Sequence, residues 1–175
     1  MPNSFIIVGV GNVLFKDERI GVYAARYLEQ NYTFTPEVNV IDGATLGFSL
    51  MTYFQEYEKV VIIDTVSIDD KAGSIYRLPA QEMLGLGSYR QTAHEVEIVE
   101  MLEICSLLEK MAEVVIIGIV PKDIKSIDIS LTQELQDVFI ELIETILLEV
   151  KDSAIRYEKT GSKTLLEIIE QTIQH

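Results

Sequence analysis

The chain has 175 residues, of which 48% are hydrophobic and 24% charged, so it has enough apolar material for one compact domain and too much to be disordered. Its 28 acidic residues outnumber 14 basic ones, and the formal net charge of -14 argues against nucleic acid as a partner because such a surface repels phosphates. A single cysteine, no export signal and no apolar run near the roughly 18–20 residues of a membrane span predict a cytoplasmic protein without a membrane span.

The first part of the chain alternates strand patterns with helical spacing. Residues 5–10 form a continuous apolar run, which is typical of a strand covered on both faces of a parallel sheet. Apolar residues then recur at helical spacing over residues 20–28. Residues 38–41 predict a shorter strand, and residues 60–63 repeat the pattern of the first one.

The second part continues this order of elements. In residues 74–78 apolar and polar residues alternate, and the pattern stops at Pro79. This predicts a strand at the edge of the sheet, which is the candidate for an antiparallel strand. Helical spacing over residues 98–108 precedes the apolar run 114–120, and a further helix is expected over residues 135–146. The order predicts a three-layer α/β/α sandwich around a mostly parallel sheet of about five strands, one of them antiparallel.

The last 25 residues differ in pattern from the rest. From residue 151 to residue 161 the chain is mainly polar, and a weak amphipathic helix follows over residues 165–173. We therefore expect a domain over residues 1–150 and a weakly helical appendage over residues 151–175 that docks on the domain or on a partner.

Acidic side chains follow the predicted strands. Asp42 and Asp64 each come directly after an apolar strand, Glu18 lies in the segment after the first strand, and His94 opens the helix before the last strand. Because ligands bind beyond the carboxyl ends of the strands in open α/β sheets, we expect these residues to meet at one edge. One imidazole and two carboxylates there would supply three ligands to a divalent ion and leave positions open for water or substrate.

Some of these signals have structural alternatives. Gly9 and Gly11 begin a dinucleotide-binding fingerprint, but Leu14 stands where its third glycine is required. A tight turn with close backbone packing explains the glycine pair better, which disfavours a nucleotide-binding α/β protein. Asp64 likewise has the alternative of capping a turn after its strand.

His94 is the only histidine inside the chain, since His175 is terminal. Thr92 and Glu95 match the capping-box pattern and place His94 in the first turn of a helix. The partial positive charge of that turn disfavours the imidazolium form, so a neutral nitrogen is available as a ligand or base. Cys105, by contrast, falls on the apolar stripe of its helix and is expected to fill the core rather than act as a nucleophile.

The motifs around these residues resemble those of one family. Residues 9–22, with the sequence GVGNVLFKDERIGV, strongly resemble the opening motif of the nickel-iron hydrogenase maturation endopeptidases. Further segments are similar in family order: VIDGAT at 40–45, IID at 62–64, AHEVE at 93–97 and IGIVP at 117–121. Together these segments extend over about residues 5–150 and leave the appendage outside the shared pattern.

The resemblance implies a phosphorylase/hydrolase-like fold and a metal-dependent endopeptidase. Such an enzyme removes a C-terminal extension from the hydrogenase large-subunit precursor after nickel insertion. The metal-contacting residues of the family correspond here to Glu18, Asp64 and His94. Asp42 corresponds to a further functional aspartate, so Asp42 or one of the two ligand carboxylates is expected to act as the general base. Ala44 departs from the family, in which a second glycine is usual.

The resemblance also implies a substrate and a metal. Nickel is expected to arrive with the precursor, and zinc or cadmium is expected to be able to occupy the same ligands in vitro. We expect a monomer that acts on the precursor in the cytoplasm. A non-catalytic chaperone module that binds nickel and the precursor without cutting would use the same ligands and is the main alternative.

Overall fold

The structure, a computed structural model, describes residues 4–44, 47–85, 93–107 and 111–173, without the side chains of residues 44, 48, 83–85 and 93–97. Its main sheet has five strands in the order β3-β1-β4-β6-β5. They are β1 (Phe5–Val10), β3 (Asn39–Ala44), β4 (Lys59–Thr65), β5 (Ile75–Pro79) and β6 (Glu113–Ile119). The first four in this order pair in parallel, and β5 pairs with β6 in the antiparallel sense. The predicted sheet, including its antiparallel edge strand, is confirmed.

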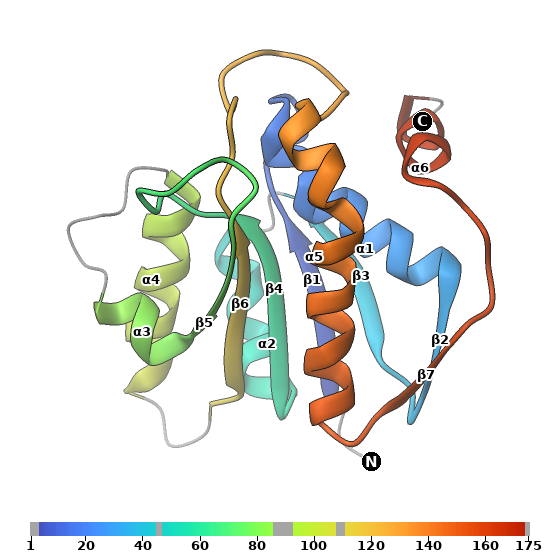
Figure 1. Cartoon of the computed structure of the whole chain (residues 1–175). Coiled ribbons are helices and arrows are strands. Elements are labelled where there is room, and N and C mark those ends of the chain that lie inside the picture. The colour runs from blue at the N-terminus through green and yellow to red at the C-terminus, as the bar shows by residue number, and fades with distance from the viewer. Residues whose placement is uncertain (1–3, 45–46, 86–92, 108–110, 174–175) are drawn as a thin grey trace.

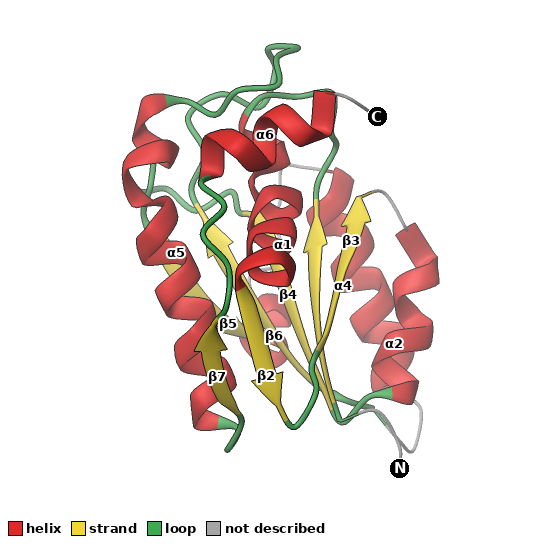
Figure 2. Cartoon of the chain, turned by 90° about the vertical axis from the view of Figure 1, so that its right-hand side faces the viewer, coloured by secondary structure: helices red, strands yellow, loops and turns green. Residues whose placement is uncertain are grey.

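Helices cover both faces of this sheet (Figures 1 and 2). One face carries α1 (Ile20–Asn31), α5 (Gln133–Asp152) and α6 (Leu165–Ile173), and the other carries α2 (Leu50–Glu56) and α4 (Ala93–Ser106), with α3 (Ala80–Gly85) beside β5 and α4. The three-layer α/β/α sandwich is therefore confirmed. Among the described residues, none of the helices combines the length and the hydrophobicity that crossing a bilayer requires.

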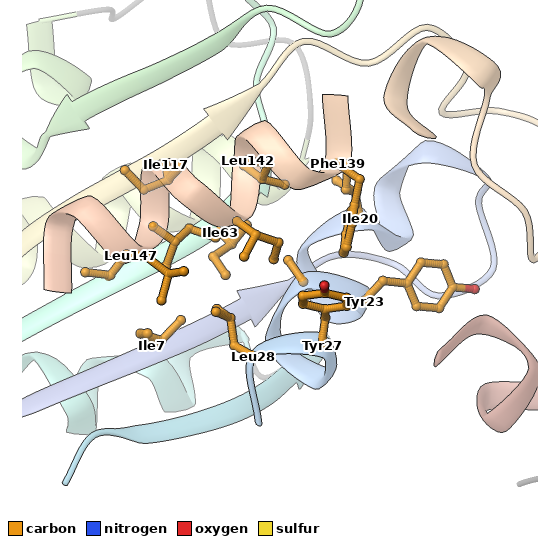
Figure 3. Packing of buried hydrophobic residues seen from close by; sticks show 14 of the residues in the cluster. Ile7, Ile20, Tyr23, Tyr27, Leu28, Ile63, Ile117, Phe139, Leu142 and Leu147 are labelled. Atoms are coloured by element: carbon orange, nitrogen blue, oxygen red, sulfur yellow. The ribbon is translucent and has the colours of Figure 1, made fainter. Parts of the chain in front are cut away.

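The central strands are buried on both faces, which explains their continuous apolar runs. In β1, Ile7 packs into the core under α1 and α5, whereas Ile6 and Val8 pack into the core under α2 and α4. Figure 3 shows the first of these cores, where side chains of α1 and α5 meet over the sheet. There Tyr27 and Phe139 pack edge to face, with their ring centroids 5.3 Å apart.

Two glycines bring α1 into direct contact with the sheet. A Cβ atom at Gly9 would lie 2.1 Å from the carbonyl oxygen of Gly21, and one at Gly21 would lie 2.4 Å from the carbonyl oxygens of Val10 and Ile63. The missing side chains therefore let the start of α1 rest on the backbone of β1 and β4. This geometry supports close packing, rather than phosphate binding, as the role of Gly9.

The C-terminal segment contains a strand that the sequence did not predict. The strand β7 (Arg156–Lys159) pairs antiparallel with β2 (Tyr32–Thr35), the short strand after α1. All four residues of β7 are exposed, so the segment has no apolar alternation by which to recognise it. Beyond it, α6 lies beside α1 (Figure 2) and buries Ile168 and Ile169 in the core. The division of the chain at residue 150 stays a prediction.

The contact between α1 and the sheet predicts the effect of Gly21→Ala. We expect this substitution to lower the free energy of unfolding by about 2–3 kcal/mol, because the added methyl group meets two backbone oxygens that cannot move independently. Gly47→Ala is the control, since nothing lies within 4 Å of its Cβ position and its φ of 57° costs only backbone strain of about 1 kcal/mol. Urea unfolding measures both, and a Gly21→Ala variant as stable as the wild type would contradict the packing account.

A buried ion pair at the opposite end of the sheet predicts a pH dependence. The Glu149 side chain is 4% exposed and accepts hydrogen bonds from Arg77 Nε at 2.7 Å and from Lys59 Nζ at 2.6 Å. Arg77 and then Lys59 lower the pKa of Glu149 to about 2, which outweighs the effect of burial. Because the pKa is lower in the folded state, its contribution of about 3 kcal/mol is present at neutral pH and lost as the pH falls from about 5 towards 2.

Comparing Glu149→Gln with the wild type tests this dependence. In urea unfolding, the wild type should be more stable than the variant by about 3 kcal/mol at pH 7. This difference should shrink at pH 3, because Glu149 is then protonated in the unfolded chain while it stays mainly ionised in the folded protein. An equal difference at both pH values would show that the ionised Glu149 does not contribute as described.

Candidate active site

Glu18 lies at the carboxyl edge of the sheet, in the short helix η1 (Asp17–Arg19) between β1 and α1. Its side chain is largely buried, and η1 contacts β4. The loop before η1 folds back at Gly11, whose φ is 155° and whose Cβ position lies 1.8 Å from the carbonyl oxygen of Glu18. A glycine is therefore required at position 11 to bring Glu18 to this place.

Asp64 stands near the carboxyl end of β4, the strand next to β1. It is 2% exposed, and its Oδ1 accepts a hydrogen bond of 2.8 Å from the backbone N–H of Thr65. The strand order thus brings the segment carrying Asp64 against the helix η1 that carries Glu18. Two buried carboxylates come from neighbouring elements at one edge, as the strand-end rule predicts.

His94 is the second residue of α4. Figure 1 shows that α4 begins at the same end of the sheet as the carboxyl ends of β1 and β4 and runs back along the sheet. The His94 side chain and Thr92, which is half of the predicted capping box, lie outside the described residues. Within the described part of the chain, no group of three histidine, cysteine, aspartate or glutamate side chains is placed to hold a metal ion. The predicted trio therefore stays a prediction.

Asp42 lies apart from Asp64. It belongs to the edge strand β3, with β1 between β3 and β4. Val40, two residues earlier, packs towards α1, whereas Ile62, two residues before Asp64, packs towards α4. Because residues two apart share a face of a strand, the two aspartates leave the sheet on opposite faces.

Asp42 is instead paired with an arginine of α1. Arg26 donates to Asp42 Oδ2 from Nη2 at 2.8 Å and from Nε at 3.2 Å. The side chain of Arg26 is 30% exposed and that of Asp42 is 28% exposed. Asp42 is recognisable in the sequence but its partner Arg26 is not, because nothing in the spacing from position 26 to position 42 marks a contact between a helix and an edge strand.

Asp17 has a structural role that the sequence did not reveal. Its side chain is fully buried, and its two carboxylate oxygens accept hydrogen bonds from the backbone N–H groups of Lys122, Asp123 and Thr132 at 2.8–2.9 Å and from the Thr132 hydroxyl. These donors all belong to the loop between β6 and α5. One carboxylate therefore fixes that loop beside Glu18, its neighbour in sequence.

Further contacts join the same two loops. Phe15 forms an isolated β-bridge with Ile127, and the Lys16 side chain donates to Asp128 at 3.1 Å and to Ser130 at 2.9 Å. Hydrogen bonds within the loop, above all from the Ser126 hydroxyl, lower the pKa of Asp123 to about 2. Asp123 is therefore ionised at neutral pH and accepts these hydrogen bonds as a carboxylate, which helps to fix the loop beside Glu18.

Cys105 is fully buried in the core under α4, as predicted. Burial raises the pKa of its thiol, which disfavours the reactive thiolate. The described residues therefore give no support to a thiol nucleophile at this position.

Comparisons with known proteins agree with this fold and these motifs. The family model for hydrogenase maturation proteases, HycI, matches residues 22–149. A Methanocaldococcus jannaschii protein assigned to the hydrogenase maturation proteases is 33% identical over 152 residues, which cover 85% of this chain and 97% of that protein. The chain therefore belongs to the hydrogenase maturation protease family, which makes it a hydrolase of peptide bonds.

Solved structures show the same architecture. The hydrogenase maturating endopeptidase HybD from Escherichia coli superposes with a TM-score of 0.81 at 24% identity, over 90% of this chain and 98% of that one. The [NiFe] hydrogenase maturation protease HybD from Thermococcus kodakarensis gives a TM-score of 0.68 at 27% identity, over 83% of this chain and 98% of that one. The fold expected from the motifs is confirmed.

The hydrogen bonds of Asp17 predict the effect of Asp17→Asn. The amide places an N–H₂ group where an oxygen accepted hydrogen bonds, so buried N–H donors of the loop lose their acceptor, and the free energy of unfolding should fall by about 2–4 kcal/mol. Asp69→Asn, at an exposed aspartate, should change stability by less than about 0.5 kcal/mol. Urea unfolding compares the two, and equal stabilities would contradict the role given to Asp17.

Proposed function

We propose that this protease removes the C-terminal extension of a nickel-iron hydrogenase large-subunit precursor after nickel insertion, and that it recognises the nickel held by the precursor. The observation that carries the proposal is the pair of buried carboxylates, Glu18 and Asp64, on neighbouring elements at the carboxyl edge of the sheet. The helix that carries His94 begins at this same edge. Family membership supports the reaction class.

The donor set suits a metal of this kind. Carboxylate oxygens and an imidazole nitrogen are ligands for borderline divalent ions, so Glu18, Asp64 and His94 fit nickel and also fit zinc or cadmium supplied in vitro. The proposed metal dependence follows from this chemistry, with the nickel brought by the substrate.

In the proposed mechanism, the three ligands position the precursor. Glu18, Asp64 and His94 contact the nickel of the immature subunit, which holds the adjacent scissile peptide bond at the edge of the sheet. A carboxylate then accepts a proton from the attacking water. Asp42 is one candidate for this general base, and the carboxylates of Glu18 and Asp64 are the others. Asp42 would act from the face of the sheet opposite to that of Asp64, where Arg26 holds it.

The oligomeric state, the compartment and the surface that the precursor approaches are also part of the proposal. We infer that a monomer acts in the cytoplasm, where a large subunit that still carries its extension is available. The wall that Asp17 fixes beside Glu18 gives the precursor a fixed surface to approach. The alternative, a chaperone module that binds nickel and precursor without cutting, uses the same residues and differs in the product.

Cleavage of nickel-loaded precursor tests the proposal. His94→Ala, Glu18→Gln and Asp64→Asn should each lower the rate of cleavage by about 100-fold or more, because each removes a ligand that positions the scissile bond. Glu29→Gln, at an exposed carboxylate of α1, is the control and should cleave as the wild type does. Mass spectrometry of the large subunit and of the released peptide measures the reaction.

Three outcomes of this experiment are informative. Release of the peptide by the wild type but not by the ligand variants supports the proposed enzyme. Stable binding of the precursor without any cleavage supports the chaperone module instead. Full processing by His94→Ala would refute the ligand role of His94.

A further inference from the structure

We propose that the C-terminal arm, residues 153–173, positions Asp42 through Arg26 and is thereby needed for efficient cleavage. The inference rests on the proposed function and takes Asp42, one of its three candidates, as the general base. It assigns Arg26 and Thr172 as positioning residues, and it gives a role to a segment beyond residue 149, where the match of the family model ends.

A chain of hydrogen bonds joins the arm to Asp42. Thr172 Oγ1 donates to the carbonyl oxygen of Ile168 at 3.0 Å, which leaves its oxygen facing Arg26 as an acceptor. Arg26 Nη1 donates to Thr172 Oγ1 at 2.9 Å, while Nε and Nη2 donate to Asp42 Oδ2. The guanidinium is planar, so contacts on both sides fix its orientation and, through it, that of the carboxylate.

The arm itself is firmly attached to α1. Asn31, the last residue of α1, is fully buried. Its side chain donates to the carbonyl oxygen of Lys163 at 3.1 Å and accepts from the Lys163 N–H at 2.8 Å. Its carbonyl oxygen accepts from the N–H groups of Thr160 at 2.8 Å and Gly161 at 3.1 Å. A buried amide that satisfies both directions of hydrogen bonding fixes the position of α6 over Arg26.

The exposure of the ion pair favours positioning over stabilisation. The side chains of Arg26 and Asp42 both reach solvent. Ion pairs of this kind contribute little to the free energy of unfolding. The ion pair can still fix the direction of the Asp42 carboxylate, even though it adds little to stability. Without Thr172, the guanidinium loses its contact on the arm side and gains rotational freedom.

Kinetics of cleavage on nickel-loaded precursor test this role in the full-length protein. Arg26→Gln and Thr172→Val should each lower kcat by about 10-fold with KM unchanged, because they misplace Asp42 without touching the metal ligands. Arg26→Lys should recover part of the loss, since lysine keeps the charge but lacks the fork. Thr172→Val should add nothing in the Arg26→Gln background, because both changes break one chain of contacts.

Gln171→Ala is the matched control. It removes the 2.8 Å hydrogen bond between Gln171 in α6 and Gln30 in α1 but leaves Arg26 and Thr172 in place. It should cleave as the wild type does. Urea unfolding of all variants, together with titration by Ni²⁺ alone, should give wild-type midpoints and affinities for Thr172→Val and Arg26→Gln.

The possible failures are distinguishable. Wild-type rates for Arg26→Gln and Thr172→Val, in a protein that Asp42→Asn inactivates, would overturn the positioning role. Loss of stability in step with loss of activity, shared by Gln171→Ala, would replace it with a purely structural one. Full activity of Asp42→Asn would remove the basis of the inference, and absence of cleavage by the wild type would overturn the proposed function and this role together.

Discussion

The direct contact between the start of α1 and the backbone of β1 and β4 is the constraint on which the candidate site depends. Gly9 and Gly21 permit it, because a side chain at either position would meet a carbonyl oxygen. The contact fixes the place of η1 at the carboxyl edge, next to the end of β4. The elements that carry Glu18 and Asp64 are therefore in contact in the fold although the two residues are far apart in the chain.

The acidic residues of this region divide several tasks among them. Asp17 is fully buried and serves the backbone of the loop before α5, while its neighbour Glu18 is left as a candidate ligand. Asp42 faces α1 and is paired with Arg26. The acidic residues therefore have different roles although they are of the same type. The role of each carboxylate depends on the partner that it contacts.

The sequence predicted what depends on local pattern. The strands were recognisable because burial on both faces requires continuous apolar runs, and Asp42 and Asp64 because they directly follow such runs. The roles of Asp17 and Asn31 were not predictable, since the loops that their side chains hold lie more than 100 residues away in the chain. The pairing of β7 with β2 was missed because an exposed polar strand carries no periodicity. The face on which Asp42 lies depends on which helix covers which side, which is a property of the assembled sandwich.

The central claim is that Glu18, Asp64 and His94 hold one metal ion at the carboxyl edge of the sheet. Anomalous diffraction at the nickel edge from crystals of the full-length protein soaked in Ni²⁺ tests it most directly. We expect one peak with donor atoms of all three residues at about 2.0–2.2 Å. A nickel ion bound elsewhere, or a peak contacted by only one of the three side chains, would contradict it.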